Sequence, residues 1–158
     1  MAKYLIGIDA GSTSSKAVIF DETGKVVASA STKSSERMHL APRGRGFEEF
    51  DVDELWRIVS QCIKQAIEKA GVAAKDIAGI GITSFGNGIV FLDKNGWSIA
   101  PGCFSQDYRA NDIIALYQQE GTYGKINRMV HGTLFAGEPG PILRWYKEHE
   151  RAVYDRIG

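Results

Sequence analysis

Apolar residues near the N-terminus fall into short runs with the composition of β-strands. Residues 4–9 (YLIGID) and 16–21 (KAVIFD) are rich in Ile, Val, Phe and Tyr, which favour strands. Between the second run and the next, the segment DETGK has Gly24 where a hairpin turn needs a positive φ. Residues 25–32 (KVVASAST) then alternate in polarity. The pattern therefore predicts two successive antiparallel hairpins.

The clearest helical pattern follows a long polar segment. Residues 33–50 (KSSERMHLAPRGRGFEEF) show no regular period, which indicates a loop long enough to be functional or mobile. After Asp51, which can form a capping box with Glu54, a helix is predicted that ends at Gly71. Its apolar residues recur at helical spacing and are interpreted as core: Leu55, Ile58, Val59, Cys62, Ile63, Ala66 and Ile67.

The remaining pattern completes a mixed α/β fold. Residues 76–84 (DIAGIGITS) lack polar alternation, which predicts a strand buried on both faces. Residues 88–93 (GIVFLD) and 97–102 (WSIAPG), joined by KNG, predict a further hairpin that continues the sheet. Helical patterns follow at 109–121, 122–130 and 141–150. This order predicts a mixed sheet with a crossover helix.

Composition and charge narrow the classes of function. The 158 residues are 44% hydrophobic, and 19 basic residues balance 19 acidic ones, so no overall charge attracts nucleic acid or an anionic membrane. No apolar run approaches the roughly 18 residues of a membrane span, and no signal-peptide pattern begins the chain. Cys62 and Cys103 are far apart and suggest neither a metal cluster nor a disulfide. We expect a cytoplasmic protein that binds neither nucleic acid nor membrane.

The segment DAGSTSSK (9–16) at the tip of the first hairpin is the candidate for anion binding. It superficially resembles a Walker A loop, but the spacing G-x-x-x-x-G-K-S/T is absent. Lys16 also leads into a strand rather than a helix, so a helix N-terminus does not capture phosphate here.

Backbone N–H groups and hydroxyls at a hairpin tip can instead form an anion-binding concavity. In this chain they belong to Gly11, Ser12, Thr13 and Ser14. Asp9 could hold a hydrated Mg²⁺, and Lys16 supplies a positive charge. The alternative is a plain turn, because Gly and Ser are common turn residues.

This tip resembles the first phosphate motif of the actin/hexokinase/Hsp70 ATPase superfamily, and the chain as a whole resembles the FGGY carbohydrate kinases. The resemblance runs from about Lys3 to Gly158, although Ile142 stands where many members carry lysine. Among the branches of the family, the L-xylulose kinases are the most similar. The segments that carry the resemblance are GFEEFDVDELW (46–56), IAGIGITSFGNGIVFLDKNGWSIAPG (77–102), SQDYRA (105–110) and PILRWYKEHE (141–150).

The resemblance implies an actin-like (ribonuclease H-like) ATPase fold of the α/β class. It implies that residues 1–158 form the N-terminal part of the first actin-like domain, and that the rest of this domain and an adenosine-binding second domain are absent. The catalytic base is expected beyond Gly158, so the chain alone is expected to be inactive. A sheet that ends in this way has an unpaired edge, which predicts self-association, for example as a homodimer.

The resemblance also implies the roles of individual residues. Asp9 is expected on the magnesium side of ATP, with the γ-phosphate at the tip residues named above and Lys16. Gly86 and Asn87 are expected to contact the sugar; the alternative is an ordinary loop with Gly86 at positive φ. Asp107 and Arg109 are expected at the substrate as well. An equal alternative for this pair is a structural ion pair that caps the helix beginning near Arg109.

The expected function is the ATP- and Mg²⁺-dependent phosphorylation of a small sugar, with a ketopentose such as xylulose as substrate. Glycerol or another polyol is the alternative substrate. A non-catalytic actin-like nucleotide switch and a sugar-binding module that does not need Asp9 are the alternative functions. The sugar-contacting segment and SQDYRA favour the kinase.

Overall fold

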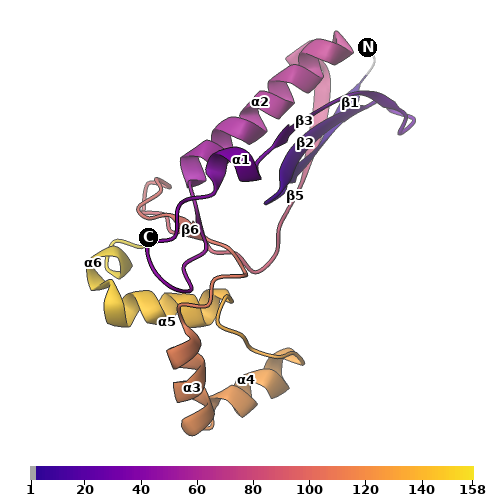
Figure 1. The fold of residues 1–158 in the computed structure, drawn as a ribbon. Helices are drawn as coiled ribbons and strands as arrows, with labels where there is room; N and C mark the ends of the chain where they lie inside the picture. The colour runs from indigo at the N-terminus through magenta and orange to yellow at the C-terminus, as the bar shows by residue number, and fades with distance from the viewer. Residues whose placement is uncertain (1–2) are drawn as a thin grey trace. The chain divides into compact units, whose positions relative to one another are not determined.

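The computed structural model describes residues 3–158 and divides the chain into two compact units (Figure 1). The first unit combines the residues up to His39 with Asp53–Phe85, and the second combines Leu40–Val52 with Gly86–Gly158. None of the helices in the described residues has the length and the hydropathy that crossing a membrane requires.

The first unit is built on a four-stranded mixed sheet. Its strands are β1 (Tyr4–Ala10), β2 (Ser14–Phe20), β3 (Val26–Lys33) and β5 (Ile77–Ser84), in the order β3-β2-β1-β5. The two N-terminal hairpins are antiparallel, as predicted, and Gly24 has a φ of 84° in the second turn. β5 pairs with β1 in parallel after the crossover helix α2 (Val52–Ala70). The predicted mixed sheet is confirmed.

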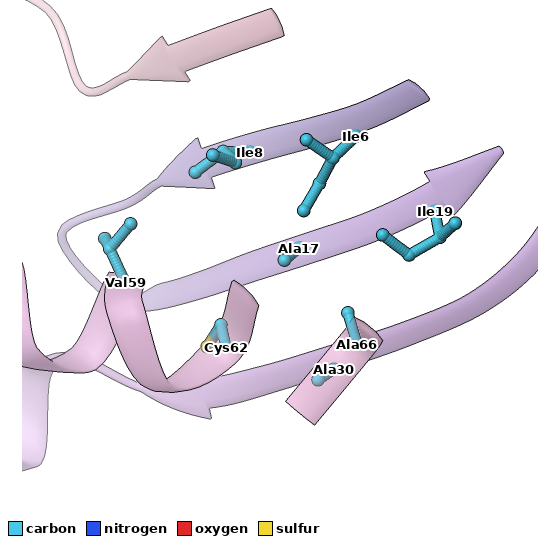
Figure 2. Packing of buried hydrophobic residues seen from close by; sticks show 8 residues of the cluster. All are labelled: Ile6, Ile8, Ala17, Ile19, Ala30, Val59, Cys62 and Ala66. Atoms are coloured by element: carbon cyan, nitrogen blue, oxygen red, sulfur yellow. The ribbon is translucent and has the colours of Figure 1, made fainter. Parts of the chain in front are cut away.

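Helix α2 packs on one face of this sheet and forms the core of the unit (Figure 2). The helix contributes every third or fourth residue, as its apolar stripe predicted. Each fully buried isoleucine stabilises the fold by about 1.5–3 kcal/mol. The buried residues of the cluster are Ile6, Ile8, Ala17, Ile19, Ala30, Val59, Cys62 and Ala66.

The prediction that residues 76–84 form a strand buried on both faces is wrong for this structure. Ile80 and Ile82 are 63% and 73% exposed, although they pair in register with the buried Ile6 and Ile8. The reason is position: β5 is the edge strand, and within the described residues only β1 pairs with it. An apolar run indicates a strand suited to burial, but its neighbours decide whether burial occurs.

The second unit contains a short two-stranded sheet and most of the helices. β4 (Glu49–Phe50) pairs with β6 (Gly102–Cys103), and a second core gathers around Phe91, Ile142 and Tyr146. The three predicted helical segments are confirmed. The helices are α3 (Asn111–Gln119), α4 (Thr122–Val130), α5 (Pro139–His149) and α6 (Arg151–Tyr154).

Two local predictions need correction. The segment 33–50 is not entirely loop, because it contains the helix α1 (Ser35–Met38) and strand β4. The hairpin at 88–102 does not continue the four-stranded sheet. Its turn forms, with the Asp93 amide donating to the Trp97 carbonyl at 2.9 Å, but only isolated bridges flank it. Pro101 lacks the amide that a longer ladder would need.

Candidate functional site

The hairpin tip of the first unit lies between Ala10, the end of β1, and Ser14, the start of β2. Gly11 is sterically required at this tip. A Cβ added there would lie 2.4 Å from the Ser14 carbonyl oxygen and 3.8 Å from an Asp9 carboxylate oxygen. The backbone therefore turns back on itself, with the Asp9 carboxylate close to the turn.

The segment that leads into α1 is hydrogen-bonded to the tip. The Thr13 carbonyl oxygen accepts hydrogen bonds from the amides of Ser34 and Ser35, at 2.9 and 3.2 Å. The hydroxyls of Ser15 and Ser34 share a further hydrogen bond of 2.8 Å, and both residues are fully buried. These contacts fix the conformation of the tip against buried residues of the first unit.

Strand register aligns three polar residues beside the tip. Asp9 pairs with Lys16 on β2 and with Thr83 on β5, so the three side chains project from the same face of the sheet. No local sequence pattern identifies Thr83, because the parallel register of two distant strands cannot be derived from such a pattern. The result is a row that combines an ammonium group, a carboxylate and a hydroxyl.

A cavity of about 410 Å³ opens over the same face of the sheet, lined among others by Asp9, Lys16 and Thr83. Its floor contains Gly7 and Gly81, which pair across β1 and β5 and have no side chains to fill the space. The cavity thus has apolar walls and a polar end, the usual composition of a small-molecule site.

The predicted sugar-contacting residues begin the second unit. Asn87, not Gly86, has the positive φ, at 57°, so the alternative of a turn that requires Gly86 at positive φ is wrong. Asn is among the few residues that tolerate this conformation. A Cβ at Gly86 would meet open space. Two residues on, Ile89 and Cys103 exchange backbone hydrogen bonds of 3.0 and 2.9 Å, which anchor the loop.

Asp107 and Arg109 form a buried ion pair, as one of the two alternatives predicted. Arg109 Nη2 lies 2.7 Å from Asp107 Oδ2, with side chains only 1% and 0% exposed. Burial by itself lowers the pKa of Arg109, but hydrogen bonds to Asp107 and Glu49 outweigh it and raise the pKa above its ordinary value. The pair does not cap α3, whose N-cap Ala110 has no side-chain hydrogen bond. The predicted contact with substrate remains a prediction.

Comparison with known proteins identifies the family. The profile of the FGGY family of carbohydrate kinases, N-terminal domain, matches residues 4–158. A "Probable L-xylulose kinase" from Pasteurella multocida is 38% identical over 155 residues, which cover 98% of this chain and 31% of that protein. An "Autoinducer-2 kinase" from Salmonella typhimurium is 36% identical over 158 residues, covering 97% of this chain and 29% of that protein.

Solved structures agree with this result. Gluconate kinase from Lactobacillus acidophilus superimposes with a TM-score of 0.86 at 25% identity, over 99% of this chain and 30% of that one. Xylulose kinase from Rhodospirillum rubrum gives a TM-score of 0.84 at 25% identity, over 98% of this chain and 31% of that one. The chain thus spans about a third of the length of the proteins it matches, and its predicted actin-like α/β fold is confirmed. It belongs to the FGGY family of carbohydrate kinases, within their N-terminal domain.

Proposed function

We propose that this chain supplies the phosphate-binding part of an ATP-dependent kinase that transfers the γ-phosphate of ATP to a hydroxyl of a small sugar. The observation that carries the proposal is the row of Lys16, Asp9 and Thr83 beside a hairpin tip in which only glycine fits at position 11. Phosphoryl transfer depends on positioning and charge neutralisation more than on covalent help from the protein. A tip of backbone amides flanked by one cation and one carboxylate suits both needs.

At the tip, the γ-phosphate would accept hydrogen bonds from the amides and hydroxyls of the residues predicted from the sequence. These are Gly11, Ser12, Thr13 and Ser14. Lys16 would add a positive charge to the same site. The hydroxyl of Thr83 is a further donor that the register places beside Asp9.

Asp9 fits a role as a magnesium-side carboxylate. Within residues 3–158 no hydrogen bond or ion pair engages its side chain, and no cluster of three or more His, Cys, Asp or Glu residues surrounds it. Mg²⁺ keeps several waters and binds one or two carboxylates together with substrate phosphates, so a single free carboxylate beside a phosphate site is suitable. When bound, the ion neutralises charge on the phosphates.

For the substrate, we propose a ketopentose such as L-xylulose, contacted by Gly86 and Asn87. The relatives named L-xylulose kinases support this choice. Asn87 offers both a donor and an acceptor to sugar hydroxyls, and the open space at Gly86 leaves room for them. Glycerol, another polyol or the substrate of the autoinducer-2 kinases are the competing outcomes. A homodimer and a cytoplasmic location remain predictions from the sequence.

The test is a phosphorylation assay of the full-length protein with ATP, Mg²⁺ and a panel of ketoses and polyols. We expect Asp9→Asn to lower kcat by about 100-fold or more while the melting temperature stays near that of the wild type. Glu22→Gln, an exposed carboxylate in the neighbouring turn, is the matched control. Near-normal turnover of Asp9→Asn would refute the assignment. Inactivity of the wild type with every substrate would favour the nucleotide-switch alternative.

A further inference from the structure

The most heavily buried charges of the second unit form one connected group around Arg109. We call Arg109, Asp107, Glu49 and Tyr146 the Arg109 cluster. Arg109 Nη2 lies 2.8 Å from Glu49 Oε1 and 2.7 Å from Asp107 Oδ2, and Nη1 donates to the Tyr146 hydroxyl at 3.2 Å. Outside the cluster, Arg43 makes two hydrogen bonds to Glu49, of 2.8 and 2.9 Å. Arg43 also pairs with Glu150 at 3.2 Å, so the two cations face three carboxylates.

The cluster is closed to ligands as well as to water. The Arg109 guanidinium carbon lies 3.9 Å from the Phe47 ring centroid and 5.1 Å from that of Trp145. The side chains of Arg109 and Glu49 are each 1% exposed. A sugar hydroxyl could reach this guanidinium only after the aromatic rings and both carboxylates had moved. Removing paired charges from their partners in a buried site is costly, so this geometry disfavours a direct contact.

The cluster does connect to the proposed substrate loop through the backbone. Glu49 pairs with Cys103 in the β4–β6 ladder, and Cys103 pairs on its other side with Ile89. Ile89 is two residues after Asn87. Glu49, whose side chain binds Arg109, therefore belongs to a ladder of three paired segments. The segment on the far side of Cys103 contains Ile89 and leads back to Asn87.

A second contact links the same segments. Asp107 Oδ2 accepts a hydrogen bond from the Glu48 amide at 2.8 Å, and the Phe104 amide donates to the Glu48 carbonyl at 2.9 Å. Asp107 thus fastens the strand that contains Glu49 to the segment that follows β6. Asn87 makes a left-handed turn, at a φ of 57°, two residues before the anchored Ile89, so the direction of its side chain follows from where this ladder holds the chain.

We propose that Arg109, Asp107 and Glu49 are positioning residues that hold the Asn87 loop for the sugar, and that they do not touch the sugar themselves. The inference rests on the proposed function. It replaces the contact that the sequence resemblance implied for Asp107 and Arg109 with an indirect role. It also gives a role to Glu49, which lies in the segment 46–56 that carries the resemblance but to which the sequence assigned no function.

The kinetic test compares variants of the full-length protein. We expect Glu49→Gln and Arg109→Lys to raise the sugar KM by roughly 10- to 100-fold, with the ATP KM changed less than about threefold. Arg43→Gln removes the partly exposed partner of Glu49, together with the surface pair to Glu150, and should act in the same direction, in case the buried variants fail to fold. Arg151→Gln breaks a surface pair of the same unit and should change neither KM.

The contrast lies in Arg43, which bonds Glu49 rather than Arg109 and which a direct contact of Arg109 with the sugar would not require. A wild-type sugar KM in both Glu49→Gln and Arg43→Gln would overturn the proposal, as would an equal rise in the KM of ATP.

A second measurement is independent of catalysis. Hydrogen exchange should show faster exchange of the Ile89 and Cys103 amides in Arg43→Gln than in the wild type or Arg151→Gln. Unchanged protection of these two amides would overturn the positioning role. This result can be obtained even if no tested sugar is phosphorylated, so a failure of this proposal differs from a failure of the proposed function.

Discussion

The hydroxyls of Ser15 and Ser34, both fully buried, share a hydrogen bond of 2.8 Å next to the hairpin tip of the first unit. Ser15 belongs to β2, directly after the tip, and Ser34 follows β3 and precedes α1. The same Ser34 donates its amide to the Thr13 carbonyl. The pair therefore connects the conformation of the tip to the core of the first unit.

Replacing both serines should lower the free energy of unfolding by less than the sum of the two single replacements. Ser34→Ala leaves the buried Ser15 hydroxyl without its partner, which costs about 1–3 kcal/mol, whereas Ser15→Ala/Ser34→Ala removes both polar groups. We expect the cost of the double variant to be smaller than the sum of the single ones in a denaturant-based double-mutant cycle. Ser31→Ala, at an exposed position of β3, serves as control. Additive costs would show that the two hydroxyls do not interact.

Gly11→Ala should damage the proposed phosphate site directly. Its Cβ would lie 2.4 Å from the Ser14 carbonyl oxygen, so the tip backbone must shift. Misplaced amides bind phosphate poorly, and we expect the KM of ATP to rise by roughly 10- to 100-fold. Gly140→Ala, in the first turn of α5, meets nothing within 4 Å and should leave the KM of ATP unchanged. An unchanged KM in Gly11→Ala would mean that the tip does not bind the nucleotide.

Gly102→Ala should destabilise the second unit. Gly102 pairs with Phe50 between β6 and β4, and an added Cβ would lie 2.3 Å from an atom of the buried Phe50 ring. Overpacking of this kind costs about 1–3 kcal/mol or more. The melting temperature of the full-length protein should fall, and Phe50→Leu should be less harmful in the Gly102→Ala background than in the wild type. Equal effects of Phe50→Leu in both backgrounds would contradict the predicted clash.

The parts of the fold that the sequence predicted correctly are those that depend on local periodicity. The stripe of α2 that contains Val59, Cys62 and Ala66 follows from helical spacing alone, and the turn at Gly24 follows from its need for positive φ. The exposure of Ile82 could not be predicted in this way. It depends on which elements lie next to β5, and this information is not local.

The same distinction applies to the candidate site. Asp9 and Gly11 can be recognised locally, because a carboxylate, a glycine and several hydroxyl residues stand together between two apolar strands. Thr83 joins them only through a parallel register between strands about seventy residues apart in sequence. The role of Arg109 likewise depends on Glu49, which is 60 residues away in sequence, so the contact between them could not be derived from a local pattern.

The Arg109 cluster should also give the protein a defined sensitivity to acid. Burial by itself raises the pKa of Glu49, but hydrogen bonds from Arg43 and Arg109 outweigh it and hold the pKa below the ordinary value of 4.5. A carboxyl group with a lowered pKa in the folded state contributes stability above pH 4.5 and loses this contribution as pH falls through the lowered pKa. The unfolding free energy should therefore decrease as the pH falls through that range.

Glu49→Gln isolates this contribution. The variant should be less stable than the wild type near neutral pH, and the difference should shrink as the pH falls below 4.5, because the wild type then loses the charge that the variant lacks. Urea unfolding of both proteins at a series of pH values measures the difference. Glu22→Gln, exposed and outside the cluster, should change stability little at any pH. A difference between Glu49→Gln and wild type that stays constant with pH would mean that ionised Glu49 is not held by its two arginines.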